Sequence, residues 1–175
     1  LVIPVNKETI HVMFRPGAQE FIIKMSKLYE IVVFTASVEA YAFPLMKALD
    51  KNNVCVQILC REHCSQQGAM YVKDMSKMGR RLEDLILLDN SPNSYYYQKE
   101  NGLPIISWFD SPTDKELQNY TEILEALAFV PDVREYLPNL CNGDNYDYLK
   151  AKKVLQEIYS HGKSNKGKIG RIKIL

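Results

Sequence analysis

Two polar residues end segments that are typical of buried strands, and a lysine lies between them in the chain. Thr35 follows the apolar run Glu30–Phe34, and Asp89 follows Asp84–Leu88. A hydroxyl beside the free backbone N–H groups of a helix start forms a small anion site. A carboxylate supplies part of a Mg²⁺ site, because this ion prefers hard oxygen ligands and keeps several waters. Lys73 would neutralise charge on a phosphoryl group. Together these residues predict a phosphoryl-transfer site.

Each of these residues alone has an ordinary structural explanation. A threonine at a strand end commonly satisfies a backbone group, and Lys73 beside Asp74 is typical of a solvated ion pair. Asp89 is also a residue type that forms turns. The phosphoryl-transfer hypothesis therefore depends on the ordered set and not on any single member.

Strand-like and helix-like segments alternate along the chain, and this alternation must position the three residues. Apolar runs without polar alternation, as in Glu30–Phe34 and Asp84–Leu88, are typical of strands buried on both faces of a parallel sheet. Further strands are predicted at Val54–Leu59 and Leu103–Trp108, and helices at Gln19–Leu28, Val38–Leu49 with Ser37 as cap, and Asp114–Leu127. The order predicts an α/β domain with helices on both faces of a mostly parallel sheet. Ligands bind such domains at the carboxyl ends of the strands, where Thr35 and Asp89 fall.

The two ends of the chain differ from this pattern. Val2–Val5 and Thr9–Phe14 predict a β-hairpin. Beyond Leu140, residues 141–145 read as a linker, Tyr146–Tyr159 as an amphipathic helix and Ser160–Leu175 as a flexible tail. We therefore divide the chain into a domain at residues 1–140 and a C-terminal helix with a basic flexible tail at residues 141–175.

Five short motifs recur in the order and near the spacing of one known family. They are Phe34–Ser37, Arg61–Cys64, Tyr71–Asp74, Leu88–Pro92 and Ser107–Phe109. They closely resemble the NLI-interacting-factor-like phosphatases of the haloacid dehalogenase superfamily, which include the small RNA polymerase II C-terminal-domain phosphatases and a dullard-type nuclear-envelope phosphatase. The similarity extends over residues 1–140. It implies a Rossmann-like haloacid dehalogenase fold, with a mostly parallel sheet and a small β-hairpin flap.

The resemblance assigns roles to residues that match the family's motifs. It implies that Thr35 binds the phosphoryl group, that Lys73 stabilises it, and that Asp89 and Asn90 hold Mg²⁺. Arg61 is implied as a lesser contact to the substrate phosphate.

The predicted hairpin resembles a flap that shapes a groove for an extended peptide in this family. By that resemblance, Val5, Val12 and Tyr41 are expected to line an apolar pocket for the substrate. Core packing is the alternative for these three residues. A short flap leaves the site open, which suits a protein substrate better than a small molecule.

One family motif is absent from the sequence. The resemblance places a strand ending in D-x-D-x-[TV] before the flap, and its aspartates supply the nucleophile and the general acid/base. The 175 residues contain no such motif. The family's strand lies between those corresponding to Glu30–Phe34 and Asp84–Leu88, so we expect these two to be left with unpaired edges. Each unpaired buried backbone group costs about 1–3 kcal/mol. We therefore expect the chain alone to be unstable and inactive, and an upstream segment to supply this strand.

The resemblance implies a magnesium-dependent protein serine/threonine phosphatase that acts through an aspartyl-phosphate intermediate. Its substrate would be an extended phosphopeptide, such as the RNA polymerase II C-terminal domain. The alternative is a non-catalytic, peptide-binding module of the same fold.

Charge is distributed unevenly along the chain. Residues 150–175 hold eight basic residues and one acidic residue, and removing them from the totals of 22 and 21 leaves 14 basic and 20 acidic residues. The acidic body argues against direct nucleic-acid binding by the domain. No apolar stretch approaches the roughly 20 residues of a membrane span. The four cysteines show no metal-ligand spacing, which favours a reducing compartment, nuclear or cytoplasmic. A membrane anchor upstream stays compatible with the sequence, and no oligomeric state is predicted.

Overall fold

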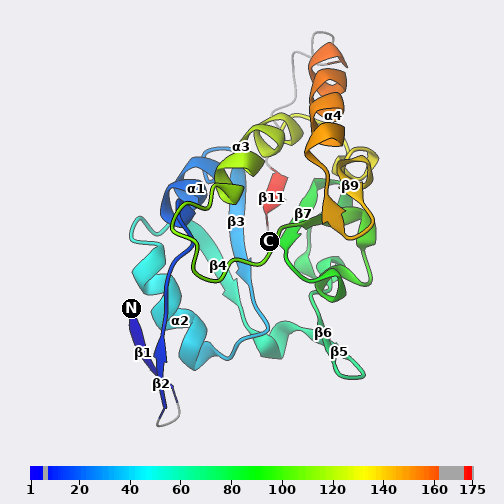
Figure 1. Ribbon diagram of the computed structural model, residues 1–175. Coiled ribbons are helices and arrows are strands. Elements are labelled where there is room, and N and C mark those ends of the chain that lie inside the picture. Colours follow the sequence, from blue (N-terminus) through cyan, green and yellow to red (C-terminus); the bar gives the residue numbers. More distant parts are fainter. Residues whose placement is uncertain (6–7, 162–171, 175) are drawn as a thin grey trace.

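A five-stranded parallel sheet organises the residues that the computed structural model describes, which are 1–5, 8–161 and 172–174 (Figure 1). The strands lie in the order β4–β3–β11–β7–β8. Their bounds are Cys55–Leu59 for β4, Tyr29–Phe34 for β3, Ile172–Ile174 for β11, Leu85–Asp89 for β7 and Gly102–Pro104 for β8. All four neighbouring pairs are parallel, as the sequence predicts. The carboxyl ends of β3 and β7 therefore point to the same edge of the sheet.

The central position of the sheet is occupied by β11, from the C-terminal end of the chain. It pairs with Tyr29–Ile31 of β3 on one side and with Leu85–Ile86 of β7 on the other. The expectation of two unpaired edges is therefore wrong, because buried backbone groups of both strands find partners on β11. The expected flexible tail is also wrong for Ile172–Ile174. The rest of that tail from residue 162 onward lies outside the described residues.

One face of the sheet is covered by three helices, α1 (Ala18–Met25), α3 (Glu116–Leu127) and α4 (Tyr148–His161). Ile31 and Ile86 point to this face and belong to a buried apolar cluster that includes side chains of all three helices. Neighbouring residues of a strand point to opposite faces of the sheet, so the residues next to Ile31 and Ile86 contribute to the other face. The predicted C-terminal helix thus shares a core with the rest of the domain.

The opposite face carries a smaller apolar cluster. Its members are Val32, Phe34, Leu59, Met75, Leu85, Leu87 and Tyr95. Much of its cover comes from single-turn 3₁₀ segments, including Met75–Met78 and Pro92–Tyr95. The remaining 3₁₀ segments are Arg61–His63, Leu82–Asp84, Lys99–Asn101, Val133–Glu135 and Leu137–Leu140.

Helix α2 (Glu39–Leu49) connects β3 to β4 and contains Pro44. The residue at its N-terminal cap is Val38, without a side-chain cap, so the predicted cap at Ser37 is wrong. Instead, the backbone N–H of Ser37 donates to Thr35 Oγ1 at 3.0 Å. The turn after β3 therefore bends around the threonine hydroxyl.

Three antiparallel hairpins flank the sheet: β1 (Val2–Val5) with β2 (Glu8–His11), β5 (Ser65–Gln67) with β6 (Met70–Val72), and β9 (Cys141–Asn142) with β10 (Asn145–Tyr146). The first confirms the predicted hairpin, and β1 packs against α2 (Figure 1). The third replaces a predicted linker, and β8 ends at Pro104, four residues before the predicted end of that strand. Among the described residues, no helix is long and apolar enough to cross a membrane.

Candidate active site

Thr35 lies at the carboxyl end of β3, as the sequence predicts. Its backbone N–H donates to the carbonyl of Leu59 on the neighbouring strand at 2.8 Å. Its Oγ1 accepts the backbone N–H of Ser37, which leaves the hydroxyl hydrogen available to a ligand. The residue is half-buried. It can therefore donate to an anion held at this edge of the sheet.

Lys73 and Asp89 form a buried ion pair, and each residue is only 8% exposed. Lys73 Nζ donates to Asp89 Oδ2, while Oδ1 of the same carboxylate accepts the backbone N–H of Ser91 at 2.8 Å. The backbone of Lys73 is held by the carbonyl of Ser94, also at 2.8 Å. Lys73 follows β6 and Asp89 ends β7, so the pair joins a hairpin to the tip of a central strand.

Cys64 lies next to the backbone of Thr35. Its Sγ lies 3.9 Å from the carbonyl oxygen of Thr35. Burial raises the pKa of the Cys64 thiol; the nearby charges of Lys73 and Arg61 act in the opposite direction, and Asp89 adds to the rise. Lys73 Nζ lies 6.0 Å from the centre of the ring of Phe34, the residue before Thr35, so the Lys73–Asp89 pair lies close to the end of β3. A thiol with a raised pKa is a poor nucleophile, so Cys64 does not replace a carboxylate there.

Asn90 follows Asp89 and is exposed. Its Nδ2 donates to Ser107 Oγ at 2.8 Å, which leaves the amide oxygen free to act as a ligand. Within the described ranges there is no group of three or more histidine, cysteine or acidic side chains that could hold a metal ion. One carboxylate and one amide oxygen still fit Mg²⁺ in part, since this ion is commonly held by one or two carboxylates, waters and substrate phosphate.

Arg61 lies next to the Thr35 turn. Its Nε donates to the carbonyl of Ala36 at 2.7 Å, and its guanidinium lies 5.2 Å from the centre of the Tyr71 ring. The residue is exposed, so its remaining N–H groups are directed to solvent at the rim of the site. The role of Arg61 as a phosphate contact stays a prediction.

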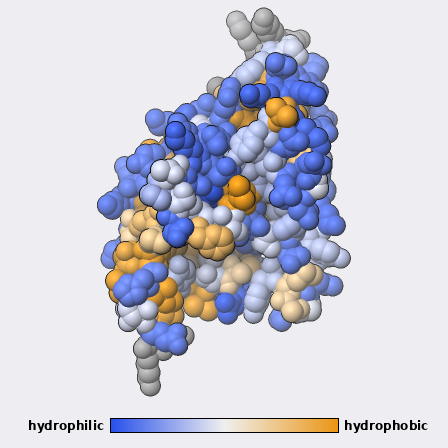
Figure 2. Space-filling view, viewed as in Figure 1, coloured by the Kyte–Doolittle hydropathy of each residue, from blue (hydrophilic) through white to orange (hydrophobic). Residues whose placement is uncertain are grey.

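Val5, Val12 and Tyr41 belong to the hairpin region and α2. Val12 is buried, with 9% of its surface exposed, and its backbone pairs with Leu1. Val5 and Tyr41 are half-buried. Exposed apolar side chains nearby include Leu1, Val2 and Phe43, and Figure 2 shows this apolar surface at the lower left, where the hairpin and α2 lie. The apolar pocket predicted for these residues stays a prediction.

Comparison with known proteins decides the family. The model of the family described as "NLI interacting factor-like phosphatase" matches residues 1–134. The chain belongs to this family. The match includes every residue of the predicted site. It ends before the hairpin β9–β10 and helix α4.

Three relatives show how similar the chain is to known proteins. The human CTD small phosphatase-like protein is 43% identical over 145 residues, which are 81% of this chain and 52% of the relative. Phosphatase Herzog of Drosophila melanogaster is 42% identical over 142 residues, or 79% of this chain and 40% of that protein. An uncharacterized Schizosaccharomyces pombe protein is 46% identical over 128 residues, or 73% and 39%. The chain thus spans about half or less of these relatives' lengths.

A solved structure of Fcp1, an essential RNA polymerase II CTD phosphatase, aligns with 91% of this chain and 52% of that chain. Its TM-score is 0.49 and its identity is 18%.

An ion pair that no sequence pattern predicted braces the rim of the NLI interacting factor-like site. Arg15 donates through Nε and Nη2 to the two carboxylate oxygens of Asp114 at 2.7 and 2.9 Å, and through Nη1 to the carbonyl of Ile106 at 2.8 Å. The Arg15 hydrogen bond lowers the pKa of the Asp114 carboxyl. The two residues are 99 positions apart, and no local pattern connects them.

Arg15 and Ile106, which are joined by a hydrogen bond, line a cavity of about 450 Å³ beside Asp89 and Asn90. Its other lining residues include Trp108 and Phe109, and Phe109 is 80% exposed. A substrate at the strand ends would therefore meet an aromatic rim.

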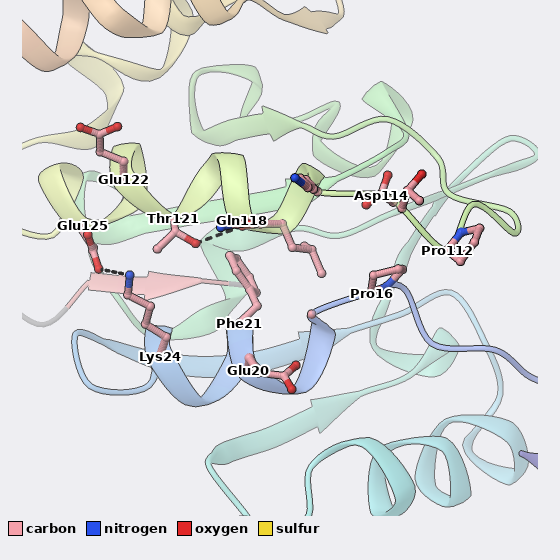
Figure 3. A pocket seen from close by; sticks show the side chains of 14 residues that line it. Pro16, Glu20, Phe21, Lys24, Pro112, Asp114, Gln118, Thr121, Glu122 and Glu125 are labelled. Carbon is pink, nitrogen blue, oxygen red and sulfur yellow. Dashed lines mark hydrogen bonds and ion pairs between the residues drawn. The ribbon is translucent and has the colours of Figure 1, made fainter.

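A larger cavity, of about 720 Å³, lies between α1 and α3, and Asp114 of the rim forms part of its lining (Figure 3). Phe21 points into it, and Lys24 forms an ion pair with Glu125 across it at 2.8 Å. None of the predicted site residues lines this cavity. Its size alone does not make it the functional site.

Proposed function

We propose that this chain is the substrate-binding body of a magnesium-dependent protein serine/threonine phosphatase. Its substrate would be an extended phosphopeptide, such as the phosphorylated tail of RNA polymerase II. Family membership and the names of the human and Drosophila relatives support phosphatase chemistry. The open edge of the sheet supports a protein substrate, since no large domain among the described residues covers it.

The observation that carries the proposal is the buried pair of Lys73 and Asp89 beside Thr35. Removing an ammonium and a carboxylate from water is costly, and apolar side chains would often stabilise the same position as well. A buried, charged pair at the end of two parallel strands is instead suited to bind opposite charges. The lysine can neutralise a phosphate dianion, and the carboxylate can hold a divalent cation.

The roles of the remaining residues follow from their positions. Thr35 would donate its hydroxyl hydrogen to a phosphate oxygen, and Lys73 would neutralise negative charge on the same group. Asp89 and Asn90 would hold Mg²⁺ through their oxygens, and the bound ion would supply further stabilisation of phosphoryl charge.

The attacking group is a carboxylate from a D-x-D-x-[TV] strand, by resemblance to the family. Its oxygen would form a bond to phosphorus as the serine or threonine oxygen leaves and takes a proton from the second aspartate. Water would then hydrolyse the acyl phosphate. Strand β11 has the sequence Ile-Lys-Ile and contains no carboxylate. We therefore expect this chain alone to bind a phosphopeptide without hydrolysing it.

The alternative function is a non-catalytic module that binds peptides in the same site. The presence of Thr35, Lys73 and Asp89 together argues against it, because a site that only binds peptides does not need phosphate and metal ligands. The two proposals differ in what the site does after a D-x-D-x-[TV] strand is supplied.

Peptide binding and turnover test both proposals. A phosphoserine peptide should bind this chain with Mg²⁺ about tenfold or more tightly than its unphosphorylated form, because charge-assisted hydrogen bonds contribute about 1.5–3 kcal/mol each. Lys73→Met and Thr35→Val should each weaken that preference. Lys77→Met is the matched control, since Lys77 is exposed and close in sequence.

Turnover is then measured after a D-x-D-x-[TV] strand is joined ahead of Leu1 in a chain that ends at His161, because β11 otherwise occupies the place between β3 and β7 that this strand would take. Release of phosphate that needs both the first aspartate and Mg²⁺ supports the enzyme, whereas phosphopeptide binding without turnover supports the non-catalytic module. Equal binding of the phosphorylated and unphosphorylated peptides would rule out the phosphatase and leave only the non-catalytic peptide-binding module.

A further inference from the structure

A second, smaller cavity adjoins the candidate metal ligand Asn90. It has a volume of about 240 Å³ and shares Asn90, Ile105, Ile106 and Ser107 with the cavity beside Asp89. Its opposite wall holds three tyrosines and two acidic residues, Glu116, Tyr120, Asp144, Tyr146 and Tyr148. We call this cavity the tyrosine pocket. A ligand bound at the strand ends could place a neighbouring group directly in it.

The three tyrosine rings pack against one another in sequence, Tyr120 on Tyr146 and Tyr146 on Tyr148. The ring centres of Tyr120 and Tyr146 are 4.3 Å apart, and those of Tyr146 and Tyr148 are 4.9 Å apart with the planes at 85°. Tyr120 is fully buried and its hydroxyl donates to the carbonyl of Pro104. Tyr148 donates its hydroxyl to Glu116 Oε2 at 2.5 Å. The rings are therefore held in place before any ligand arrives.

The charge of the tyrosine pocket favours a cation. Neither Glu116 nor Asp144 forms an ion pair with any described residue. Arg15, a nearby guanidinium, is already engaged by both oxygens of Asp114. Burial and the hydrogen bond to Glu116 raise the pKa of Tyr148 to about 12, so its ring stays neutral at physiological pH. Neutral tyrosine faces attract ammonium and guanidinium groups, and a nearby carboxylate adds to that attraction.

The volume of the tyrosine pocket indicates which kind of group binds there. Its volume is below the roughly 300–1,000 Å³ that small-molecule sites occupy, and suits a single side chain. The wall at residues 144–148 lies outside the residues 1–134 that match the family model. Part of the wall of the pocket therefore comes from residues beyond the match to the family model.

We propose that the tyrosine pocket binds a lysine or arginine side chain of the phosphopeptide, close in sequence to the phosphoserine. This inference rests on the proposed function, because the peptide must be held by its phosphate at Thr35, Lys73 and Asp89. The pocket selects substrates in which a basic residue accompanies the phosphorylated residue.

The test uses this chain and fluorescent phosphoserine peptides, with binding measured by fluorescence anisotropy in the presence of Mg²⁺. One arginine is placed in turn at each of the three positions on either side of the phosphoserine. Every peptide has a partner with citrulline, which has nearly the same shape without the charge. At the preferred position, arginine should bind about 5- to 10-fold more tightly than citrulline. A lysine series shows which of the two cations fits better.

Two substitutions remove the recognition in different ways. Tyr148→Leu removes an aromatic face, and Glu116→Gln removes a charge, and each should reduce the arginine preference to less than about 2-fold. The matched controls are Tyr159→Leu on the exposed side of α4 and Glu125→Gln on the same helix as Glu116. Both controls should keep the full preference. Unchanged fluorescence of Trp108, the single tryptophan, verifies that the fold is retained.

The outcomes separate this inference from the proposed function. Equal binding of arginine and citrulline peptides at every position, with the phosphate preference intact, would overturn the tyrosine pocket alone. So would an equal loss of arginine preference in the control variants. An arginine preference without any phosphate preference would overturn the proposed function while supporting cation binding by the pocket.

Discussion

The two faces of the sheet differ in how they are covered. Helices α1, α3 and α4 pack over one face and bury the larger apolar cluster. Much of the cover of the other face is single-turn 3₁₀ segments, and Lys73 lies beside its smaller cluster. Helices bury continuous apolar stripes, whereas short turns bring backbone and polar groups close to the strand ends. The helical face thus serves mainly stability, apart from the tyrosine pocket at its edge, and the turn-covered face positions Lys73.

The largest effect is expected from a substitution in β11, because this strand pairs with both β3 and β7. Lys173→Pro removes a backbone donor from a strand with partners on both sides and should cost on the order of 3–5 kcal/mol. Lys173→Ala, which keeps the N–H, is the control. Urea unfolding followed by circular dichroism measures both. Equal stability of the two variants would show that β11 does not support the sheet.

A matched pair of core substitutions sharpens the comparison of faces. Leu124→Ala on the helical face and Met75→Ala on the turn-covered face both remove fully buried side chains. Each should lower the free energy of unfolding by about 2–5 kcal/mol. Only Met75→Ala should also weaken phosphopeptide binding, since Met75 lies two residues from Lys73. Loss of binding in both variants, at a temperature where both are folded, would contradict the division between the faces.

Lys73→Met tests the buried pair itself. The substitution leaves Asp89 buried without its cation, which should cost about 2–3 kcal/mol, below the 3–5 kcal/mol of fully enclosed pairs because this pair lies at the sheet edge. Millimolar Mg²⁺ should restore part of that loss if Asp89 holds the ion. Calorimetric melting with and without Mg²⁺ measures it. Asp89→Asn should abolish the magnesium effect.

The smallest effect concerns the rim and depends on pH. The pKa of Asp114 is lowered by Arg15, so the ion pair stabilises the fold above the ordinary carboxyl pKa of about 3.9. That contribution is lost as the pH falls below this value through the folded-state pKa. Asp114→Asn should cost less than about 1 kcal/mol at pH 7 and progressively less toward pH 2–3. Unfolding followed by Trp108 fluorescence at several pH values checks this, with Asp110→Asn as the control. A cost that does not change with pH would exclude the ion pair as its source.

Sequence patterns predicted the parts of the fold that depend on neighbouring residues. The apolar runs that form β3 and β7 can be recognised because strands buried on both faces have few polar residues. Thr35 and Asp89 could be placed at one edge because parallel strands end on the same side. The β5–β6 hairpin and the early end of β8 were not predicted. Each of these three strands has only three residues, too few to show an alternation of apolar and polar residues.

The tertiary structure decided which distant groups meet. The ion pair of Arg15 with Asp114 and the packing of Tyr146 on Tyr120 join residues whose separation leaves no local signal. The central place of β11 is likewise set by backbone hydrogen bonds, which are the same for every residue type except proline and so leave little trace in the sequence. The sequence therefore determined the residues at the strand ends. Only the folded chain determined the strand between them and the aromatic pocket beside them.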